Sequence, residues 1–93
     1  MKKILVIGRH HLILERTLNI ISNHGHQVKG ILDTEEAIQW VLENHPDIVF
    51  LSGGIEPSTI KYIQHKLDQR YTGEIIPDSS PHTIHEKMED LKG

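Results

Sequence analysis

Two short apolar runs constrain the fold of this chain more than any other feature. Residues 4–7 read Ile-Leu-Val-Ile and residues 48–51 read Ile-Val-Phe-Leu. The first run is too short for a membrane span or for the apolar segment of a signal peptide. A strand with one face in water alternates between apolar and polar residues, and neither run does so. Both are therefore predicted to be strands covered on both faces by helices.

Amphipathic patterns separate these strands and predict four helices. The helices cover about residues 11–23, 34–44, 56–72 and 80–92. In the third helix the predicted core face runs from Ile60 to Tyr71, and Gly73 ends the helix. Two strands of mixed composition are predicted at residues 27–32 and 74–76, the latter stopped by Pro77.

Strands that alternate with helices over short connections indicate parallel βαβ units with right-handed crossovers. The uniformly apolar first and third strands are predicted to be central, and the mixed second and fourth strands to be edges. The resulting strand order is 2-1-3-4, which is flavodoxin-like. We expect one α/β domain over residues 1–93, with a three-layer parallel sheet and four βα units.

Composition excludes several classes of function. The net charge is −3 and no block of like charge occurs, so nothing indicates nucleic-acid or membrane binding. The chain has no cysteine, which excludes disulfides and thiolate chemistry. A cytoplasmic location is the default expectation, and no cofactor is indicated.

Several segments resemble a bacterial response-regulator receiver domain, in register over about residues 3–67. They are residues 3–7, 25–28, 34–38 and 46–51. The end of the chain, where Ile76-Pro77 precedes a Ser-Pro helix start, is also similar to the end of a receiver. A typical receiver has one βα unit more, so the resemblance implies a shortened sheet whose edge is exposed or covered by a partner.

The positions that carry receiver chemistry differ here. The resemblance implies an acidic pair after the first strand, where this chain has Gly8-Arg9, and an aspartate at Ser52. The lysine expected before the last proline is Ile76. Mg²⁺ needs oxygen ligands, and a serine without an activating base is a poor nucleophile. We therefore expect no aspartyl-phosphate cycle and no enzymatic activity.

Ligands of such sheets bind where the first and third strands end. The crevice there is predicted to be lined by Arg9, His10, His11, Ser52, Gly53, Gly54, Asp78 and Ser79. Arg9 beside a helix start and opposite two glycines could receive an anion. Alternatively, the glycines only form tight turns and Arg9 pairs with Asp78 or Asp33.

The eight histidines include two close pairs, His24 with His26 and His82 with His85. A zinc site needs three or four converging ligands. The two pairs are distant along the chain and no carboxylate cluster joins them, so we expect solvated surface histidines and no metal site.

Two aromatic residues are candidates for a partner surface. Trp40 and Tyr62 lie off the apolar stripes of their predicted helices and should point outward from the same side of the sheet. Ordinary packing between neighbouring helices is the alternative. Ile13 and Ile20 form a further apolar line that either widens the core contact or docks a partner.

The resemblance and its departures together predict a non-catalytic pseudo-receiver that acts by protein–protein contact in bacterial regulation. Its partner is another protein or a second copy of the chain. The alternative is a domain that binds a small ligand or an anion in the strand-end crevice.

Overall fold

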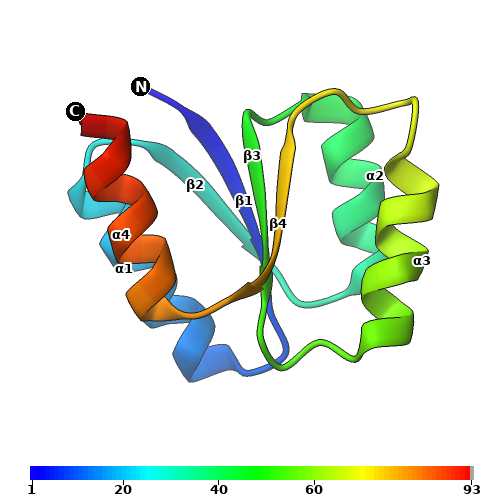
Figure 1. Cartoon of the computed structure of the whole chain (residues 1–93), viewed down its shortest axis with the longest axis horizontal. Helices are drawn as coiled ribbons and strands as arrows, with labels where there is room; N and C mark the ends of the chain where they lie inside the picture. The colour runs from blue at the N-terminus through cyan, green and yellow to red at the C-terminus, as the bar shows by residue number, and fades with distance from the viewer. Residues whose placement is uncertain (93) are drawn as a thin grey trace.

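The computed structural model describes residues 1–92, and over these residues four strands alternate with four helices (Figure 1). The elements in chain order are β1 (Lys3–Ile7), α1 (His11–Asn23), β2 (Gln27–Ile31), α2 (Thr34–Asn44), β3 (Ile48–Ser52), α3 (Pro57–Leu67), β4 (Glu74–Ser79) and α4 (Pro81–Lys92).

The strands form one parallel sheet in the order β2-β1-β3-β4. This confirms the flavodoxin-like order predicted from the apolarity of the strands. Ile7 at the end of β1 pairs with Ile31 of β2 and Leu51 of β3, so these three strands end at the same edge of the sheet. Helices α1 and α4 cover one face, and α2 and α3 cover the other (Figure 1).

Alternation along the central strands divides the core between the two faces. Ile4 and Val6 of β1 pack with Phe50 of β3 toward α1 and α4. Their neighbours Leu5 and Ile7 pack toward α2 and α3. Each central strand therefore contributes apolar side chains to the core on both faces of the sheet. This is why neither run alternates between apolar and polar residues.

The helix boundaries have local causes in the sequence. The Asp33 carboxylate accepts a 2.8 Å hydrogen bond from the backbone N–H of Glu36 and caps α2. The Ser80 hydroxyl accepts a 3.2 Å hydrogen bond from the N–H of Thr83, and Pro81 begins α4. Just after the C-terminal end of α1, Gly25 has a φ of 83°, a conformation that glycine adopts without strain.

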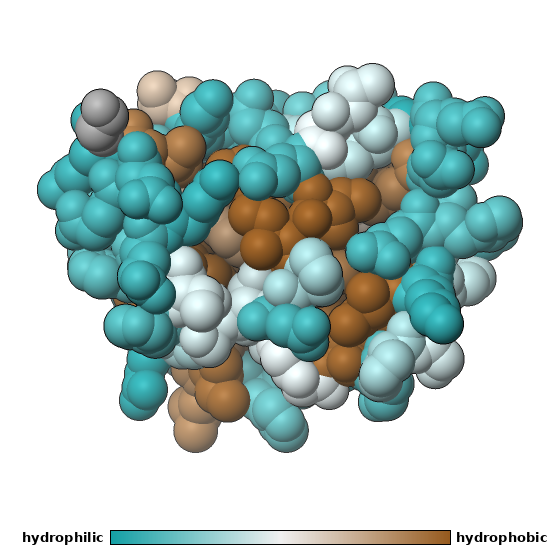
Figure 2. All heavy atoms as spheres, in the orientation of Figure 1, coloured by the Kyte–Doolittle hydropathy of each residue, from teal (hydrophilic) through white to brown (hydrophobic). Residues whose placement is uncertain are grey.

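The last strand is longer than predicted. Pro77 does not stop β4, which continues to Ser79. Because β4 is an edge strand, the missing N–H of Pro77 costs no hydrogen bond to a further strand. The pairing with β3 shifts register between Phe50 and Ser52, and Asp78 adopts a φ of 54° beside this irregularity. Apolar atoms reach the surface along this edge (Figure 2).

The third helix is shorter than predicted. It ends at Leu67, and Gln69 has a left-handed φ of 65°, so Tyr71 is not part of the helix. Tyr71 nevertheless is buried in the core beneath α2 and α3, at 8% exposure. The helical spacing of its position was correct in indicating burial and wrong in indicating a helix.

Candidate functional site

A surface hollow of about 260 Å³ lies where β1 and β3 end, at the place predicted for a ligand. It is lined by His10, Ile13, Ser52, Gly53, Gly54, Ser79, Ser80 and Pro81. The irregular end of β4 closes one side, because the Gly53 N–H donates a 3.0 Å hydrogen bond to the Ser79 carbonyl oxygen.

Five of the predicted crevice residues therefore come together: His10, Ser52, Gly53, Gly54 and Ser79. A Cβ at Gly54 would lie 3.5 Å from the His10 ring, an ordinary van der Waals contact, so the approach of these residues does not require glycine there. The buried Ser79, also predicted here, donates its hydroxyl to the Ile76 carbonyl oxygen at 2.9 Å.

Arg9 and Asp78 do not line the hollow. The Arg9 guanidinium lies 3.9 Å from the Glu56 carboxylate, so the expected pairing with Asp78 or Asp33 is wrong. Its Nε is buried without a hydrogen-bond partner. Asp78 lies in β4 with a left-handed φ and is exposed, and His11 pairs with Glu15 on its own helix at 2.9 Å.

Glu56 is the residue that sequence reasoning missed. It directly precedes Pro57 and was interpreted only as the start of the third helix. It takes that role, because it is the N-cap of α3, and its carboxylate also lies 3.9 Å from the Arg9 guanidinium. A carboxylate just before a helix that begins beside the crevice was the signal available in the sequence.

The chemistry of the hollow is limited. Among the described residues that line it there is one imidazole, three hydroxyls and no carboxylate, and its exposed lining is mostly apolar. A hard cation such as Mg²⁺ requires oxygen ligands, usually including carboxylates. Such a lining suits apolar contact and a few hydrogen bonds better than cation or phosphoryl chemistry.

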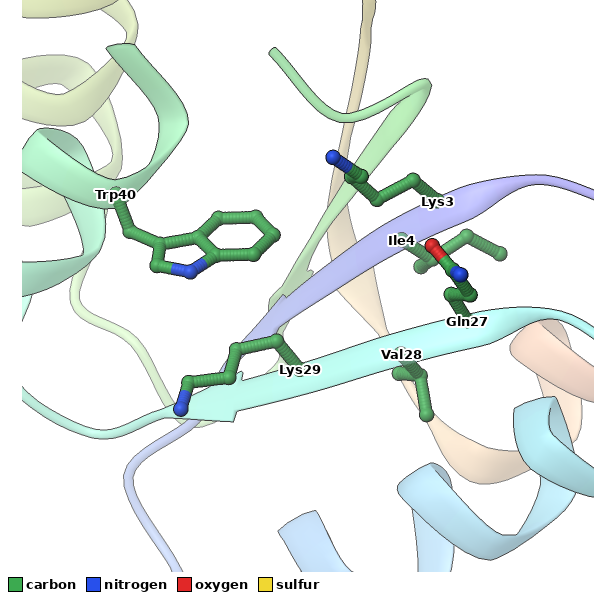
Figure 3. A pocket seen from close by; sticks show the side chains of 6 residues that line it. All are labelled: Lys3, Ile4, Gln27, Val28, Lys29 and Trp40. Atoms are coloured by element: carbon green, nitrogen blue, oxygen red, sulfur yellow. The ribbon is translucent and has the colours of Figure 1, made fainter. Parts of the chain in front are cut away.

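The predicted outward orientation of Trp40 is wrong. Its indole does not point outward but lies against the sheet edge, half-buried over β1 and β2 between Lys3 and Lys29 (Figure 3). The cause lies in β2, where Gln27 and Lys29 share a face with Leu5 of β1. Helix α2 finds no apolar partner on that part of the edge strand, and the indole covers the gap.

Tyr62 does lie at the surface, with 38% exposure. Its hydroxyl donates a hydrogen bond to the Glu35 carboxylate, which together with partial burial raises the pKa of Tyr62. Lys66 lies 5.6 Å from the ring centre. Trp40 and Tyr62 thus have different surroundings, although α2 and α3 share a face of the sheet as predicted.

Ile13 and Ile20, predicted to act together, also separate. Ile20 packs against the core between α1 and α4, whereas Ile13 is 43% exposed and lines the hollow. Leu12, beside it, is 78% exposed. The two ends of α1 therefore differ in role.

The histidine pairs are distant in sequence but not in space. His24 from the first pair and His85 from the second lie together with Glu89. The expectation that no carboxylate joins them is wrong, because α1 and α4 pack side by side.

The fold is that of a receiver domain, a flavodoxin-like α/β class. The chain is similar to the crystal structure of the N-terminal domain of a response regulator receiver protein from Methanoculleus marisnigri JR1, at 17% identity and a TM-score of 0.60. That similarity covers 99% of this chain and 94% of the other. A fusion described as the yeast Spc42 trimeric coiled coil, amino acids 181–211, joined to another structure matches at 18% identity and a TM-score of 0.56, over 98% and 80% of the two chains.

No protein-family model matches the sequence, and no curated protein matches it. At these identities the structural likeness establishes the fold alone. In the described part of the chain, no helix has the length and apolarity needed to cross a membrane.

Proposed function

We propose that this chain is a non-catalytic pseudo-receiver, which acts in signalling or regulation through protein–protein contact. The observation that carries the proposal is the apolar hollow where a receiver holds its acidic pair and its phospho-accepting aspartate. Gly8-Arg9 and Ser52 occupy those positions, and the lining supplies no carboxylate.

Electrostatics at this corner oppose phosphoryl chemistry. The guanidinium beside the end of β1 carries a positive charge, which repels a divalent cation. The carboxylate of Glu56 lies 3.9 Å from this Arg9 guanidinium and forms an ion pair with it. Among the residues that line the hollow, no carboxylate lies beside Ser52 to hold a metal ion, so a metal-assisted transfer lacks the ligands it needs.

The same corner is suited to contact with a protein. Leu12 and Ile13 stand exposed at the start of α1, next to the mostly apolar hollow. Figure 2 shows apolar atoms at the lower end of the molecule, over this start of α1. We call Leu12, Ile13 and the hollow the apolar corner. Exposed apolar side chains beside a concave apolar surface favour association.

A second copy of the chain is the first partner to test. A projecting Leu12 and an adjacent hollow on one surface are self-complementary in a two-fold dimer, where each copy inserts into the other. Sedimentation velocity over a range of concentrations should reveal a dimer. Leu12→Ser together with Ile13→Ser should abolish it, whereas Tyr62→Ser on the opposite face should not. A dimer that persists in the double variant would contradict the apolar corner.

The absence of phosphorylation has its own test. The protein is incubated with acetyl phosphate and Mg²⁺ beside an active receiver domain as positive control, and both are measured by intact mass spectrometry. We expect the control to gain a phosphoryl group and this chain to remain unmodified. Stoichiometric phosphorylation of this chain would overturn the proposal.

The second candidate function is binding of a small ligand, favoured by the volume of the hollow, about 260 Å³. Its lining suits a mostly apolar molecule better than an anion, because Arg9 turns toward Glu56. Native mass spectrometry separates the candidates. A monomer with a stoichiometric small adduct supports ligand binding, and loss of that adduct in Arg9→Ala would restore the anion interpretation.

A further inference from the structure

His24, His85 and Glu89 form a cluster, here called the two-histidine cluster, on the face of the sheet that α1 and α4 cover. His24 caps the C-terminal end of α1, and His85 and Glu89 lie one turn apart on α4. The apolar corner lies at the opposite end of α1, whose length is roughly 20 Å. The cluster is therefore independent of the proposed function.

The ligand-type atoms of the cluster converge on one carboxylate oxygen. Oε1 of Glu89 lies 3.4 Å from Nε2 of His24 and 3.6 Å from Nε2 of His85. One such atom from each residue lies within 4.8 Å of the other two. In a tetrahedral zinc site, metal–ligand bonds near 2.05 Å put neighbouring ligand atoms about 3.4 Å apart. Two of the three separations are already close to that value.

A backbone hydrogen bond sets the tautomer of His24. Its Nδ1 lies 2.9 Å from the carbonyl oxygen of Ile20, and a carbonyl can only accept, so Nδ1 carries the proton. In the neutral ring, Nε2 then presents its lone pair to Glu89. Histidines that bind metals commonly donate their other N–H to a carbonyl in this way. The His24 side chain is only 11% exposed, so its ring orientation is constrained by packing.

The electrostatics of the cluster require a positive charge between these groups. An imidazole lone pair facing a carboxylate oxygen is repulsive unless a proton or a metal ion lies between them. The second carboxylate oxygen of Glu89, Oε2, lies 3.9 Å from the Lys92 ammonium, so the first oxygen, Oε1, is the one that faces the two imidazoles.

We propose that His24, His85 and Glu89 bind a divalent transition metal ion, with zinc as the best fit. Two imidazoles and one carboxylate form a known zinc donor set that leaves a fourth position for water. His85 and Glu89 are exposed, so the fourth position opens to solvent. Because the ligands come from α1 and α4, the ion joins two helices and binds the folded state selectively.

Helix α4 contains a matched control. His82 and Glu86 have the same spacing as His85 and Glu89, and their Nε2 and Oε1 atoms are 3.1 Å apart. His82 is not a member of the three-residue cluster. If spacing along α4 were sufficient for zinc binding, both pairs would bind equally.

The test uses the full chain without an affinity tag, stripped with a chelator and titrated with zinc chloride by calorimetry near pH 7.5. We expect one zinc ion per chain. His24→Gln, His85→Gln and Glu89→Gln should each weaken binding about tenfold or more, and His82→Gln should leave it unchanged. Equal losses in His82→Gln and His85→Gln, or no loss in His24→Gln, would overturn the site, as would the absence of zinc binding.

A second measurement guards against variants that lose binding by losing their fold. Thermal unfolding is recorded for each variant with chelator and with excess zinc. A zinc-bridged α1–α4 pair predicts that zinc raises the melting temperature of the unmodified chain and of His82→Gln. The same addition should not raise it for Glu89→Gln, whose zinc-free melting temperature should stay near that of the unmodified chain. An equal zinc-induced rise in Glu89→Gln would contradict the proposal.

Discussion

The Tyr71 hydroxyl donates a 2.7 Å hydrogen bond to the backbone carbonyl oxygen of Pro46, within the core beneath α2 and α3. The bond joins the loop after α3 to the loop before β3. Each of these two buried polar groups thereby has a hydrogen-bond partner, which explains why a tyrosine fits an otherwise apolar site.

Replacing this tyrosine measures how much the hydrogen bond contributes to the free energy of unfolding. Tyr71→Phe keeps the ring but leaves the Pro46 carbonyl without its donor, which should cost about 1–2 kcal/mol of unfolding free energy. Urea denaturation at pH 7 measures the loss. A variant as stable as the unmodified chain would mean that water satisfies the carbonyl.

The same residue predicts a loss of stability in alkali. Burial, with the nearby Asp47 and Glu74 carboxylates, raises the pKa of Tyr71 to about 12, against about 10 in an unfolded chain. Above pH 10 the unfolded chain releases this proton and the folded chain retains it. The stabilisation is therefore complete below pH 10 and is lost as the pH rises toward 12, by about 2–3 kcal/mol. Denaturation at pH 9 and pH 11.5 should show this extra loss relative to Tyr71→Phe.

Gly73 should be coupled to that hydrogen bond. A Cβ at this position would overlap the Tyr71 hydroxyl and lie 2.8 Å from the Pro46 carbonyl oxygen. Gly73→Ala should destabilise the protein by about 1–3 kcal/mol, since the hydroxyl must move. In a double-mutant cycle the cost should be smaller when Tyr71→Phe is already present. Strictly additive costs would show that the clash is with the Tyr71 ring carbon Cζ, which phenylalanine keeps, or with the Pro46 carbonyl, and not with the hydroxyl.

The N-cap of α2 predicts a cost at Asp33. Asp33→Ala removes the acceptor for the Glu36 N–H and should cost about 1 kcal/mol, whereas Asp33→Asn should be nearly neutral. Asp90→Ala, at an exposed residue of α4, serves as the control. Thermal denaturation of the three variants is the measurement.

Introducing one receiver residue should not confer phosphorylation. Ser52→Asp supplies an acceptor carboxylate at the end of β3, but Gly8-Arg9 still provides no oxygen ligands for Mg²⁺. We expect no phosphoryl group on Ser52→Asp after incubation with acetyl phosphate and Mg²⁺, by intact mass. A Cβ at Gly8 would lie 3.4 Å from the nearest side-chain carbon of Leu14, so this position tolerates a side chain. Adding Gly8→Asp and Arg9→Asp is therefore a feasible gain-of-function comparison.

The sheet was predictable because its signals are local. The unbroken apolarity of residues 4–7 and 48–51 indicated the central strands, and the mixed composition of the other two indicated edges. Helix starts at Asp33 and Pro81 were also readable, since a cap acts within one turn. The boundaries that failed, at Leu67 and Pro77, depend on how an edge strand and a loop meet the rest of the sheet.

The candidate site was predictable in place but not in composition. Strand order alone located the hollow and brought Ser52 and His10 to it. It did not reveal that Arg9 would turn to Glu56, because that choice depends on where α3 begins in space. Nor did it reveal that Trp40 would cover the edge of the sheet, which depends on the polar face of β2.

The sequence by itself determined the layers and the strand order, because both follow from which residues stand at which chain positions. Only the tertiary structure decided the contacts between side chains distant in sequence. His24 and His85 are far apart along the chain, and they meet at Glu89 because α1 and α4 pack on one face of the sheet. Helix packing sets such distances through the shapes of many side chains at once, and no local pattern encodes them.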